Sequence, residues 1–278
     1  MSVVARPPEW TYLGCGNCGV YFVDPMPSGD AVPDAGEFYD ETYYSGAPRA
    51  REDEWDALTA RAWRAQVKAF TDLAGTTGRL LDVGCGTGKL LAAARDVGWD
   101  VEGVEVSSAA DYARSVLGLK VFTGTLEGAG HPDASFDAVW LSHVVEHVPD
   151  PVALLREVVR VLKPGGYAKI SVPNSGGFVY AATNLVHRLR GRYGKDKFTS
   201  SLSPPGHLYA FNEKSLRVAL AKVSLAPVKV FTAGKGDPVY FPILTWQGSG
   251  KWSQALRAAE WVGRHSGRGT LIECIARR

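Results

Sequence analysis

Hydrophobic and polar positions change their spacing at about residue 79, and the new pattern predicts strands and helices in alternation. Short apolar runs of strand type are each followed by a segment whose apolar residues recur every three or four positions. The predicted strands are RLLDVG, DVEGVEVS, KVFTG, SFDAVWLS, YAKISVP, VKVFTAG and LIECIARR. A helix over roughly 52 to 74 precedes them, because apolar residues there also follow helical spacing. The alternation predicts an α/β fold, with a mostly parallel sheet and helices on both of its faces.

Capping residues mark the ends of the predicted helices. Ser108, with Asp111 three residues later, has the pattern of a capping box. Asp150 and Asn212 stand directly before two further helical patterns, where their side chains are expected to accept hydrogen bonds from the first backbone N–H groups. Pro164, followed by two glycines, is expected to end the helix that Asp150 begins.

Two segments depart from the alternation. Residues 1–50 are irregular and rich in Gly, Pro and Asp, so we expect a leader and lid segment there, ahead of a main domain at 51–278. Residues 174–211 form a long excursion that holds the basic run HRLRGRYGKDK and ends in SPPGHLYAF. Because long excursions within compact domains are more often functional than idle, we expect this one to cap the substrate site.

Composition and charge narrow the class of protein. Of the 278 residues, 45% are apolar and 22% charged, and the formal net charge of +2 gives no reason to expect a nucleic-acid partner. No apolar run is long enough to span a membrane, and the first residues lack the apolar core of a signal peptide. The four cysteines are scattered and form no disulfide framework. We therefore expect a cytoplasmic protein, monomeric or homodimeric, without membrane attachment.

A glycine loop with two acids predicts a nucleotide site. Gly84, Gly86 and Gly88 follow the first predicted strand, where a backbone without Cβ atoms can approach a ligand. The helix after the loop offers unpaired N–H groups. Glu105 ends the next strand, 21 residues after Gly84, where a carboxylate can accept hydrogen bonds from both ribose hydroxyls. Loop and acid together predict a cofactor that contains adenosine.

The details of the loop favour S-adenosylmethionine over a dinucleotide. In a dinucleotide fingerprint the third glycine would fall at position 89, which is lysine here. Asp82 would repel a pyrophosphate, whereas a carboxylate at this place suits the ammonium group of an amino acid. A dinucleotide-dependent oxidoreductase and a tight turn without a ligand stay open as alternatives.

Four motifs closely resemble those of class I S-adenosylmethionine-dependent methyltransferases: LLDVGCGTG, VEGVEVS, FDAVWLSHVVEHV and LKPGGYAKISVPN. The resemblance covers about residues 78–175 and continues more loosely through GHLYAFNEKSL. It implies a Rossmann-like doubly wound sheet of seven strands, in which LIECIARR is the antiparallel last strand. The leader CGNCGVYFVDPMP resembles one that is common in a bacterial, small-molecule branch of this superfamily.

The resemblance also implies a set of cofactor-binding residues for S-adenosylmethionine and its product S-adenosylhomocysteine. Thr125 takes the place where the family usually has an aspartate near the adenine amine, and Leu126 follows it. The full set is Asp82, Gly84, Cys85, Gly86, Gly88, Glu105, Val106, Thr125, Leu126 and Ser142.

The candidate catalytic residues lie in HVVEH: His143, Glu146 and His147. If this stretch is helical, their spacing puts all three on one face. His143 is then a candidate general base, because its usual pKa suits neutral pH. A second reading makes the three residues metal ligands, completed by His207; ubiquinone-pathway and small-RNA methyltransferases carry a similar trio with glutamate at the place of His143. Nitrogen ligands would favour zinc or another transition metal. A third reading is that Glu146 and His147 only brace the loop. A divalent metal is thus an alternative that the sequence does not favour.

Three further features have both a functional and a structural reading. Tyr39, Tyr43 and Tyr44 either fold over the cofactor as a lid or cover the edge of the core. Lys163 and the basic run of the cap either meet an anionic acceptor or form a solvated face. The run comprises Arg188, Arg190, Arg192, Lys195 and Lys197. Cys15 and Cys18 form half of a zinc ribbon, which we expect to be metal-free, with zinc shared across a dimer as the alternative.

The sequence therefore predicts a methyltransferase that acts on a small molecule, with a hydroxyl oxygen as the favoured acceptor. A sugar, a quinone or phenol precursor, or a secondary metabolite would each fit. The aromatic residues of the cap suit a flat or apolar acceptor, with simple packing as the alternative. The chain has no (N/D)PPY-type motif after the fourth strand, which weakens an amide or adenine N-methyltransferase. A catalytically inactive cofactor-binding partner protein is the remaining alternative.

Overall fold

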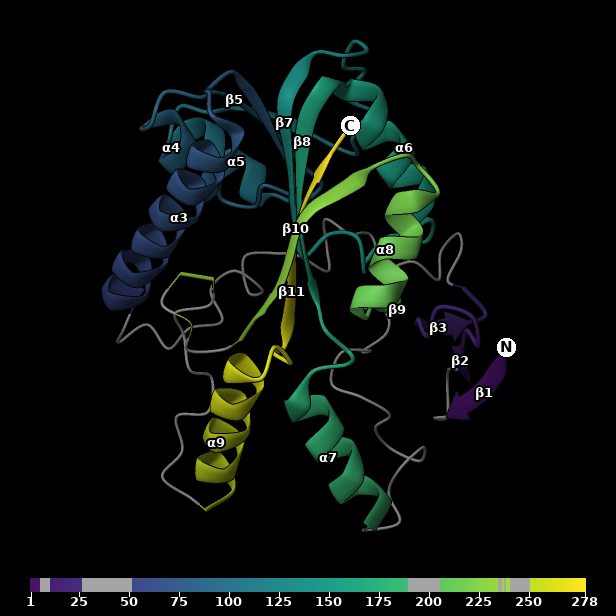
Figure 1. The fold of residues 1–278 in the computed structure, drawn as a ribbon. Helices are drawn as coiled ribbons and strands as arrows, with labels where there is room; N and C mark the ends of the chain where they lie inside the picture. Colours follow the sequence, from purple (N-terminus) through teal and green to yellow (C-terminus); the bar gives the residue numbers. More distant parts are fainter. Residues whose placement is uncertain (6–10, 27–51, 190–205, 235–236, 238, 241–250) are drawn as a thin grey trace.

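The computed structural model describes residues 1–5, 11–26, 52–189, 206–234, 237, 239–240 and 251–278 (Figure 1). The three lid tyrosines, the middle of the cap and the basic residues from Arg190 to Lys197 lie outside these described residues. Within them the chain builds one large sheet, the helices that cover it and a small second sheet.

The large sheet has seven strands in the order β10-β11-β8-β7-β4-β5-β6. The strands are β4 (Arg79–Val83), β5 (Asp100–Glu105), β6 (Lys120–Thr123), β7 (Phe136–Ser142), β8 (Leu162–Pro173), β10 (Ala226–Ala233) and β11 (Leu271–Arg277). β4 to β8 pair in parallel, and β11 runs antiparallel to both of its neighbours. The predicted doubly wound sheet, with its antiparallel last strand, is therefore confirmed.

Helices cover both faces of this sheet (Figure 1). The helices are α3 (Glu52–Ala74), α4 (Lys89–Arg95), α5 (Ala109–Ser115), α6 (Pro151–Val161), α7 (Phe178–Leu189), α8 (Glu213–Ala221) and α9 (Lys251–His265). One core cluster joins the sheet to α3, α4 and α5, and it is centred on Trp140, whose ring lies 5.3 Å from that of Phe70. A second cluster joins the other face to α6 and α8. Side chains that alternate along the strands thus enter two different cores.

A small antiparallel sheet connects the leader with the end of the predicted cap. Its strands are β1 (Ser2–Ala5), β2 (Thr11–Gly14), β3 (Tyr21–Asp24) and β9 (Tyr209–Ala210), in this order. Tyr12, Val23 and Leu208 form its buried core. Because β9 belongs to the segment around His207, the leader helps to hold that segment in place.

Two of the predicted caps are confirmed, one lacks its side-chain bond, and one helix ends earlier than predicted. Asp150 Oδ1 accepts hydrogen bonds from the backbone N–H groups of the next turn at 3.0 and 2.9 Å, and Asn212 forms a capping box with Ser215. Ser108 is the N-cap residue of α5 as predicted, but its backbone is itself helical (φ −62°, ψ −13°), so its side chain makes no cap hydrogen bond. Helix α6 ends at Val161 rather than at Pro164, since the chain turns extended at Leu162 and continues directly as β8.

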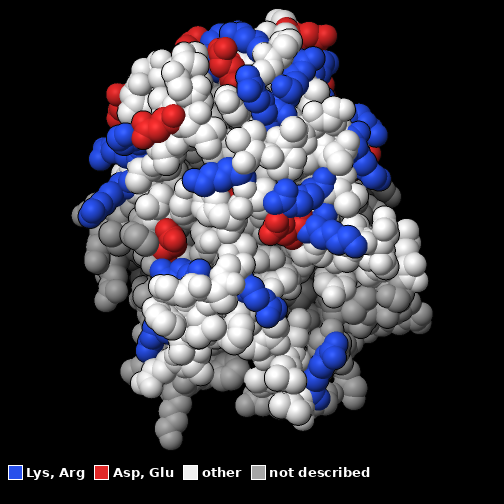
Figure 2. Space-filling view, viewed as in Figure 1, with Lys and Arg blue, Asp and Glu red and all other residues white. Residues whose placement is uncertain are grey.

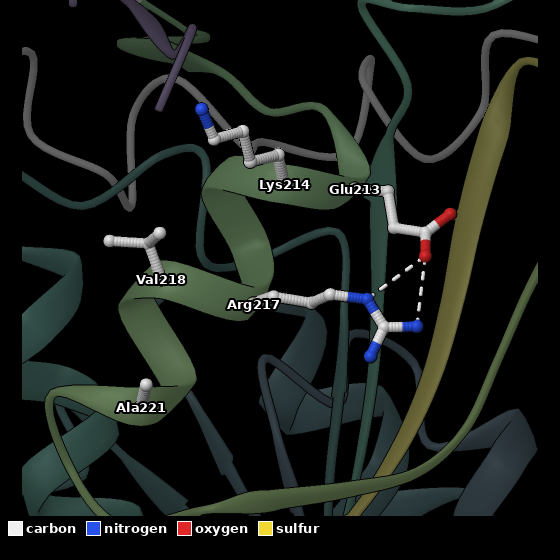
Figure 3. A pocket seen from close by; sticks show the side chains of 5 residues that line it. All are labelled: Glu213, Lys214, Arg217, Val218 and Ala221. Carbon is white, nitrogen blue, oxygen red and sulfur yellow. Dashed lines mark hydrogen bonds and ion pairs between the residues drawn. The ribbon is translucent and has the colours of Figure 1, made fainter. Parts of the chain in front are cut away.

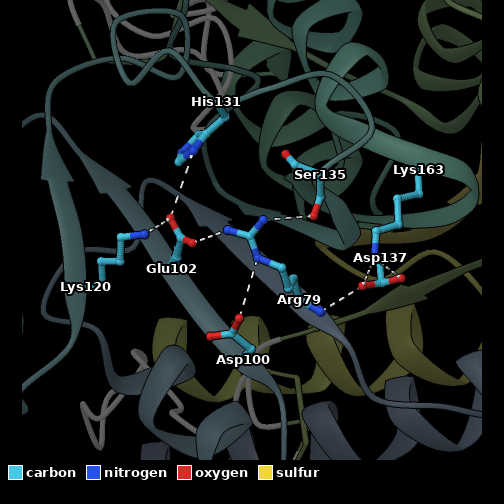
Figure 4. Close-up of polar contacts among 8 residues, drawn as sticks. All are labelled: Arg79, Asp100, Glu102, Lys120, His131, Ser135, Asp137 and Lys163. Atoms are coloured by element: carbon cyan, nitrogen blue, oxygen red, sulfur yellow. Dashed lines mark hydrogen bonds and ion pairs between the residues drawn. The ribbon is translucent and has the colours of Figure 1, made fainter.

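Ion pairs tie together the amino ends of the parallel strands, opposite the glycine loop (Figure 4). Arg79 bonds Glu102 across to β5, and Lys163 Nζ lies 2.8 Å from Asp137 Oδ2. Lys163 therefore stabilises this edge of the sheet. Acidic and basic side chains are interspersed on the face drawn in Figure 2, as expected for a solvated surface.

Gly103 is required by the packing under the glycine loop. A Cβ at this place in β5 would lie 2.7 Å from Cys85 Sγ and 2.8 Å from Leu91 Cδ1. We expect Gly103→Ala to lower the free energy of unfolding by about 1–3 kcal/mol, as overpacked cores do. Gly16→Ala is the matched control, because a Cβ at Gly16 would meet nothing within 4 Å. Urea unfolding of both variants measures the difference, and an equal effect would contradict the packing argument.

Candidate active site

Two buried acids lie at the carboxyl ends of neighbouring strands. Asp82 in β4 and Glu105 in β5 are each 3% exposed. Asp82 pairs with Gly103, two residues before Glu105, so both side chains point to the same face of the sheet. Burial, followed by the charge of Glu105, raises the pKa of Asp82 well above its usual value. The two acids therefore form a buried, electronegative pair that a cation would stabilise.

Glu105 holds the glycine loop in place. Its Oε2 accepts a hydrogen bond from Gly86 N at 2.7 Å, and its Oε1 accepts one from Ser107 N at 2.9 Å. The backbone N–H of Gly84 also donates to Val104 O at 2.7 Å. These bonds place the carboxylate directly beside the loop, as the sequence predicts.

The glycines of the loop serve the backbone and the packing of the protein itself. Gly84, Gly86 and Gly88 have φ angles of +73°, +52° and +77°, which residues with a Cβ rarely adopt. A Cβ at Gly84 would lie 2.6 Å from Val144 Cγ2, and one at Gly88 would lie 2.6 Å from Leu119 Cδ1. The sequence predicts that the glycines let the backbone come close to a ligand. At Gly84 and Gly88 the backbone also comes close to side chains of the protein itself, so the absence of a Cβ serves packing as well.

The other predicted cofactor residues divide into buried and accessible ones. Cys85 and Leu126 are buried in the two cores, and burial raises the pKa of the Cys85 thiol. Val106 and Thr125 are exposed, and Ser142 is partly buried at the end of β7. The accessible residues lie at or just after the carboxyl ends of β5, β6 and β7, at the same edge of the sheet as the glycine loop.

The HVVEH stretch is a turn and not a helix. His143 has a φ angle of +57°, and its backbone N–H donates to Ser171 O at 3.0 Å. The backbone N–H of His147 donates to Val144 O at 3.0 Å, which closes the turn. The assumption that this stretch is helical is therefore wrong, although the turn still brings His143, Glu146 and His147 together.

His143 and Glu146 form a hydrogen-bonded pair. His143 Nδ1 lies 3.2 Å from Oε1 of Glu146, whose side chain is fully buried. Burial alone would lower the pKa of His143, but the hydrogen bond and the charge of Glu146 outweigh it and raise that pKa. The bond to Nδ1 leaves Nε2 as the ring nitrogen that can take a proton from another molecule.

His207 joins the same group from the end of the cap segment. Its ring centre lies 4.6 Å from that of His147, and the backbone N–H of Leu208 donates to Glu146 O at 2.9 Å. Glu146, His147 and His207 each offer one ligand atom within 4.8 Å of the others. Glu146 Oε2 is buried without a hydrogen-bond partner in the described part of the chain. Burial lowers the pKa of His147 to about 4, which keeps its ring neutral. These three residues could hold a cation.

Cys15 and Cys18 lie in the hairpin turn between β2 and β3, and neither forms a disulfide. Hydrogen bonds from the backbone of Cys18 and Asn17 lower the pKa of the Cys15 thiol to about 7. In the described ranges, no third histidine, cysteine or acid joins this pair in a cluster that could hold a metal.

Sequence reasoning missed a buried polar cluster on β8 and β11. Lys169, Ser171 and Glu273 are all buried and bond one another. The available signal was a lysine and a glutamate within strands that are otherwise apolar, AKISVP and LIECIA. None of the predicted site residues lines the open hollow on α8 in Figure 3, where Arg217 pairs with Glu213.

The arrangement is that of a known class of protein. The structure superposes on a SAM-dependent methyltransferase from Thermotoga maritima with a TM-score of 0.55, at 19% identity over 87% of this chain and 98% of that one. It also superposes on geranyl diphosphate C-methyltransferase from Streptomyces coelicolor, with a TM-score of 0.51 at 19% identity over 77% of each chain. These likenesses show the fold of class I S-adenosylmethionine-dependent methyltransferases.

The family follows from the sequence. Residues 50–230 match the model of a family described as a methyltransferase domain, so the chain belongs to that family. A ubiquinone biosynthesis O-methyltransferase from Xanthomonas oryzae pv. oryzae is 36% identical over 145 residues, which are 44% of this chain and 60% of the relative. 27-O-demethylrifamycin SV methyltransferase from Amycolatopsis mediterranei is 36% identical over 127 residues, 40% of this chain and 46% of the relative. The match thus spans less than two thirds of these relatives.

None of the described helices is long and apolar enough to cross a membrane.

Proposed function

We propose that the protein transfers a methyl group from S-adenosylmethionine to a hydroxyl oxygen of a small molecule. The observation that carries the proposal is the buried pair of acids beside the glycine loop. The choice of oxygen is supported by the two curated relatives, because one is named as an O-methyltransferase and the other modifies a 27-O-demethyl compound. A quinone or phenol precursor and a secondary metabolite are the acceptor classes that these names favour.

Asp82 and Glu105 fit the charged and polar ends of the cofactor. Asp82 is buried beside another acid, so the ammonium group of the cofactor would relieve the repulsion that raises its pKa. Glu105 already accepts two backbone hydrogen bonds at the loop, which fix its carboxylate where ribose hydroxyls would meet it. Val106, Thr125 and Ser142 complete the proposed cofactor site, since they follow the neighbouring strands.

His143 is the proposed general base. The cofactor supplies a methyl group on a sulfonium, which is reactive enough that the protein has mainly to align the acceptor and exclude water. His143 Nε2 takes the proton of the acceptor hydroxyl, and Glu146 holds the ring through Nδ1 and stabilises the imidazolium that forms. His147 and His207 pack against this pair and shape the site.

A divalent cation is the competing explanation for the same residues. Glu146, His147 and His207 would hold it, and the buried, unpartnered Glu146 Oε2 fits such a ligand set. There the cation would lower the pKa of the acceptor hydroxyl directly. The bond between His143 and Glu146 favours the base mechanism, because a base needs an orienting acid and a metal site does not need His143.

Metal removal distinguishes the two mechanisms. After treatment with EDTA we expect unchanged methyl transfer, and metal analysis of the purified protein should find no stoichiometric zinc at either the histidine cluster or the Cys15–Cys18 turn. Loss of activity that zinc or magnesium restores would contradict the base mechanism. The same analysis on Cys15→Ser separates a metal bound at the hairpin from one bound at the histidines.

A screen of acceptors tests the proposed function. The protein is incubated with S-adenosylmethionine and with sets of phenols, quinols, sugars and amines, and release of S-adenosylhomocysteine is measured. We expect release with a hydroxyl compound. Release with amines only would overturn the choice of oxygen, and binding of the cofactor without release for any acceptor would favour an inactive partner protein.

A further inference from the structure

A buried ion pair lies in the sheet close to the two cofactor acids. Lys169 in β8 and Glu273 in β11 are 3% and 2% exposed. Lys169 Nζ bonds Glu273 Oε2 and Ser171 Oγ, and Ser171 Oγ also lies 2.5 Å from Glu273 Oε2. Desolvation offsets most of the attraction within a buried pair, so stability alone does not account for these charges.

The sheet register places Lys169 on the same face as Asp82. Asp82 is the direct partner of Trp140 in β7, and Trp140 is the direct partner of Lys169 in β8. Adjacent strands are about 4.8 Å apart, so the Cα atoms of Asp82 and Lys169 are roughly 10 Å apart. Lys169 Nζ lies 5.1 Å from the centre of the ring of Trp140, a residue of β7, which is the strand between β4 and β8.

The charges around Asp82 have opposite effects. Burial and the charge of Glu105 favour a neutral carboxyl, whereas the charge of Lys169 favours the carboxylate. Cys85, a further titratable neighbour, is a buried thiol whose raised pKa keeps it neutral. The carboxylate is the form that can pair with an ammonium group, so the charge of Lys169 acts on the affinity of this end of the site.

We propose that Lys169 is a positioning residue of the cofactor site, whose charge acts on Asp82 from across Trp140 and favours its pairing with an ammonium group, while Glu273 and Ser171 hold the Lys169 side chain in place. The inference rests on the proposed function, because it assumes that Asp82 binds the amino-acid part of S-adenosylmethionine. It adds a residue of β8 that makes no direct contact with the cofactor.

Two variants that break the same ion pair test this role by changing charge in opposite directions. Lys169→Met removes the positive charge. Glu273→Gln removes the negative charge, but its amide oxygen can still accept from Lys169 and Ser171. The probes are S-adenosylhomocysteine and 5′-methylthioadenosine, which lacks the amino-acid part, and calorimetry on the full chain gives both affinities.

We expect Lys169→Met to lower the affinity for S-adenosylhomocysteine roughly tenfold and to leave the affinity for 5′-methylthioadenosine unchanged. Glu273→Gln should leave the affinity for S-adenosylhomocysteine equal or higher. Equal losses in both variants, or equal losses for both probes, would overturn the inference and make the pair a structural scaffold.

A double variant provides the test if Lys169→Met does not fold. This variant, Lys169→Met/Glu273→Gln, leaves no unpaired buried charge. It should still lose affinity for S-adenosylhomocysteine alone, because Lys169 is one strand nearer to Asp82 than Glu273 is; unchanged affinity would overturn the inference. If the unsubstituted protein binds 5′-methylthioadenosine and S-adenosylhomocysteine equally, the role of Asp82 and this inference both fail. If the protein binds neither compound, the proposed function itself is overturned.

Discussion

Asp82→Asn is expected to abolish most of the cofactor affinity while it stabilises the free protein. The change removes the negative charge that pairs with the ammonium group, and a charge-assisted bond of about 2 kcal/mol corresponds to roughly a 30-fold loss of affinity. The same change removes a buried charge beside Glu105, so the cofactor-free variant should melt at a higher temperature at neutral pH. Calorimetric titration with S-adenosylhomocysteine and thermal unfolding measure the two effects.

The sign of the stability effect follows from the raised pKa of Asp82. The unfolded chain loses this proton at a lower pH than the folded protein does, so the carboxyl opposes folding above its ordinary pKa. The advantage of Asp82→Asn should therefore disappear in acid, where Asp82 is protonated in both states. Asp100→Asn is the matched control, because Asp100 lies in β5 at the opposite edge of the sheet and is 72% exposed (Figure 4). Unchanged affinity in Asp82→Asn would refute the role of Asp82.

His143→Ala is expected to reduce turnover by two orders of magnitude or more, with unchanged affinity for S-adenosylhomocysteine. General bases contribute about 10²- to 10⁴-fold, and the His143 side chain takes no part in the proposed cofactor site. The measurement uses the acceptor that the screen identifies. Full activity in His143→Ala would remove this residue from the mechanism. Glu146 and His147 would then act either as ligands of a cation or as structural braces.

The pH dependence of turnover gives a second readout for the same pair. A base must be neutral, so the rate should rise with pH through the raised pKa of His143. Glu146→Gln removes the charge that raises this pKa, so the rising limb should move to lower pH while the maximal rate falls. If the rising limb of the pH–rate profile stays at the same pH in Glu146→Gln, a group other than His143 controls the rate.

The sheet and the neighbouring positions of Asp82 and Glu105 could both be predicted from the sequence. Alternating strand and helix patterns depend on local spacing, and the ends of parallel strands meet at one edge, so Asp82 and Glu105 were bound to be neighbours. The capping box at Ser108 did not form because the backbone of Ser108 is already helical, and the side chain of Asp111 bonds Arg114 instead of reaching back. Helical spacing failed at HVVEH because Ser171 of the neighbouring strand holds the backbone of His143.

Contacts between segments that are distant in the chain could not be predicted from the sequence. The pairing of β3 with β9 and the bond between Lys169 and Glu273 join residues that local patterns cannot connect. The position of His207 near His147 could be predicted only through a family resemblance, and the contact between the two rings confirms it.

Binding of S-adenosylmethionine beside the two acids and the glycine loop is tested most directly by one titration. The protein is titrated with S-adenosylhomocysteine and, separately, with NAD under the same conditions. We expect one S-adenosylhomocysteine to bind per chain and no heat of binding with NAD. Binding of NAD without binding of S-adenosylhomocysteine would contradict the account.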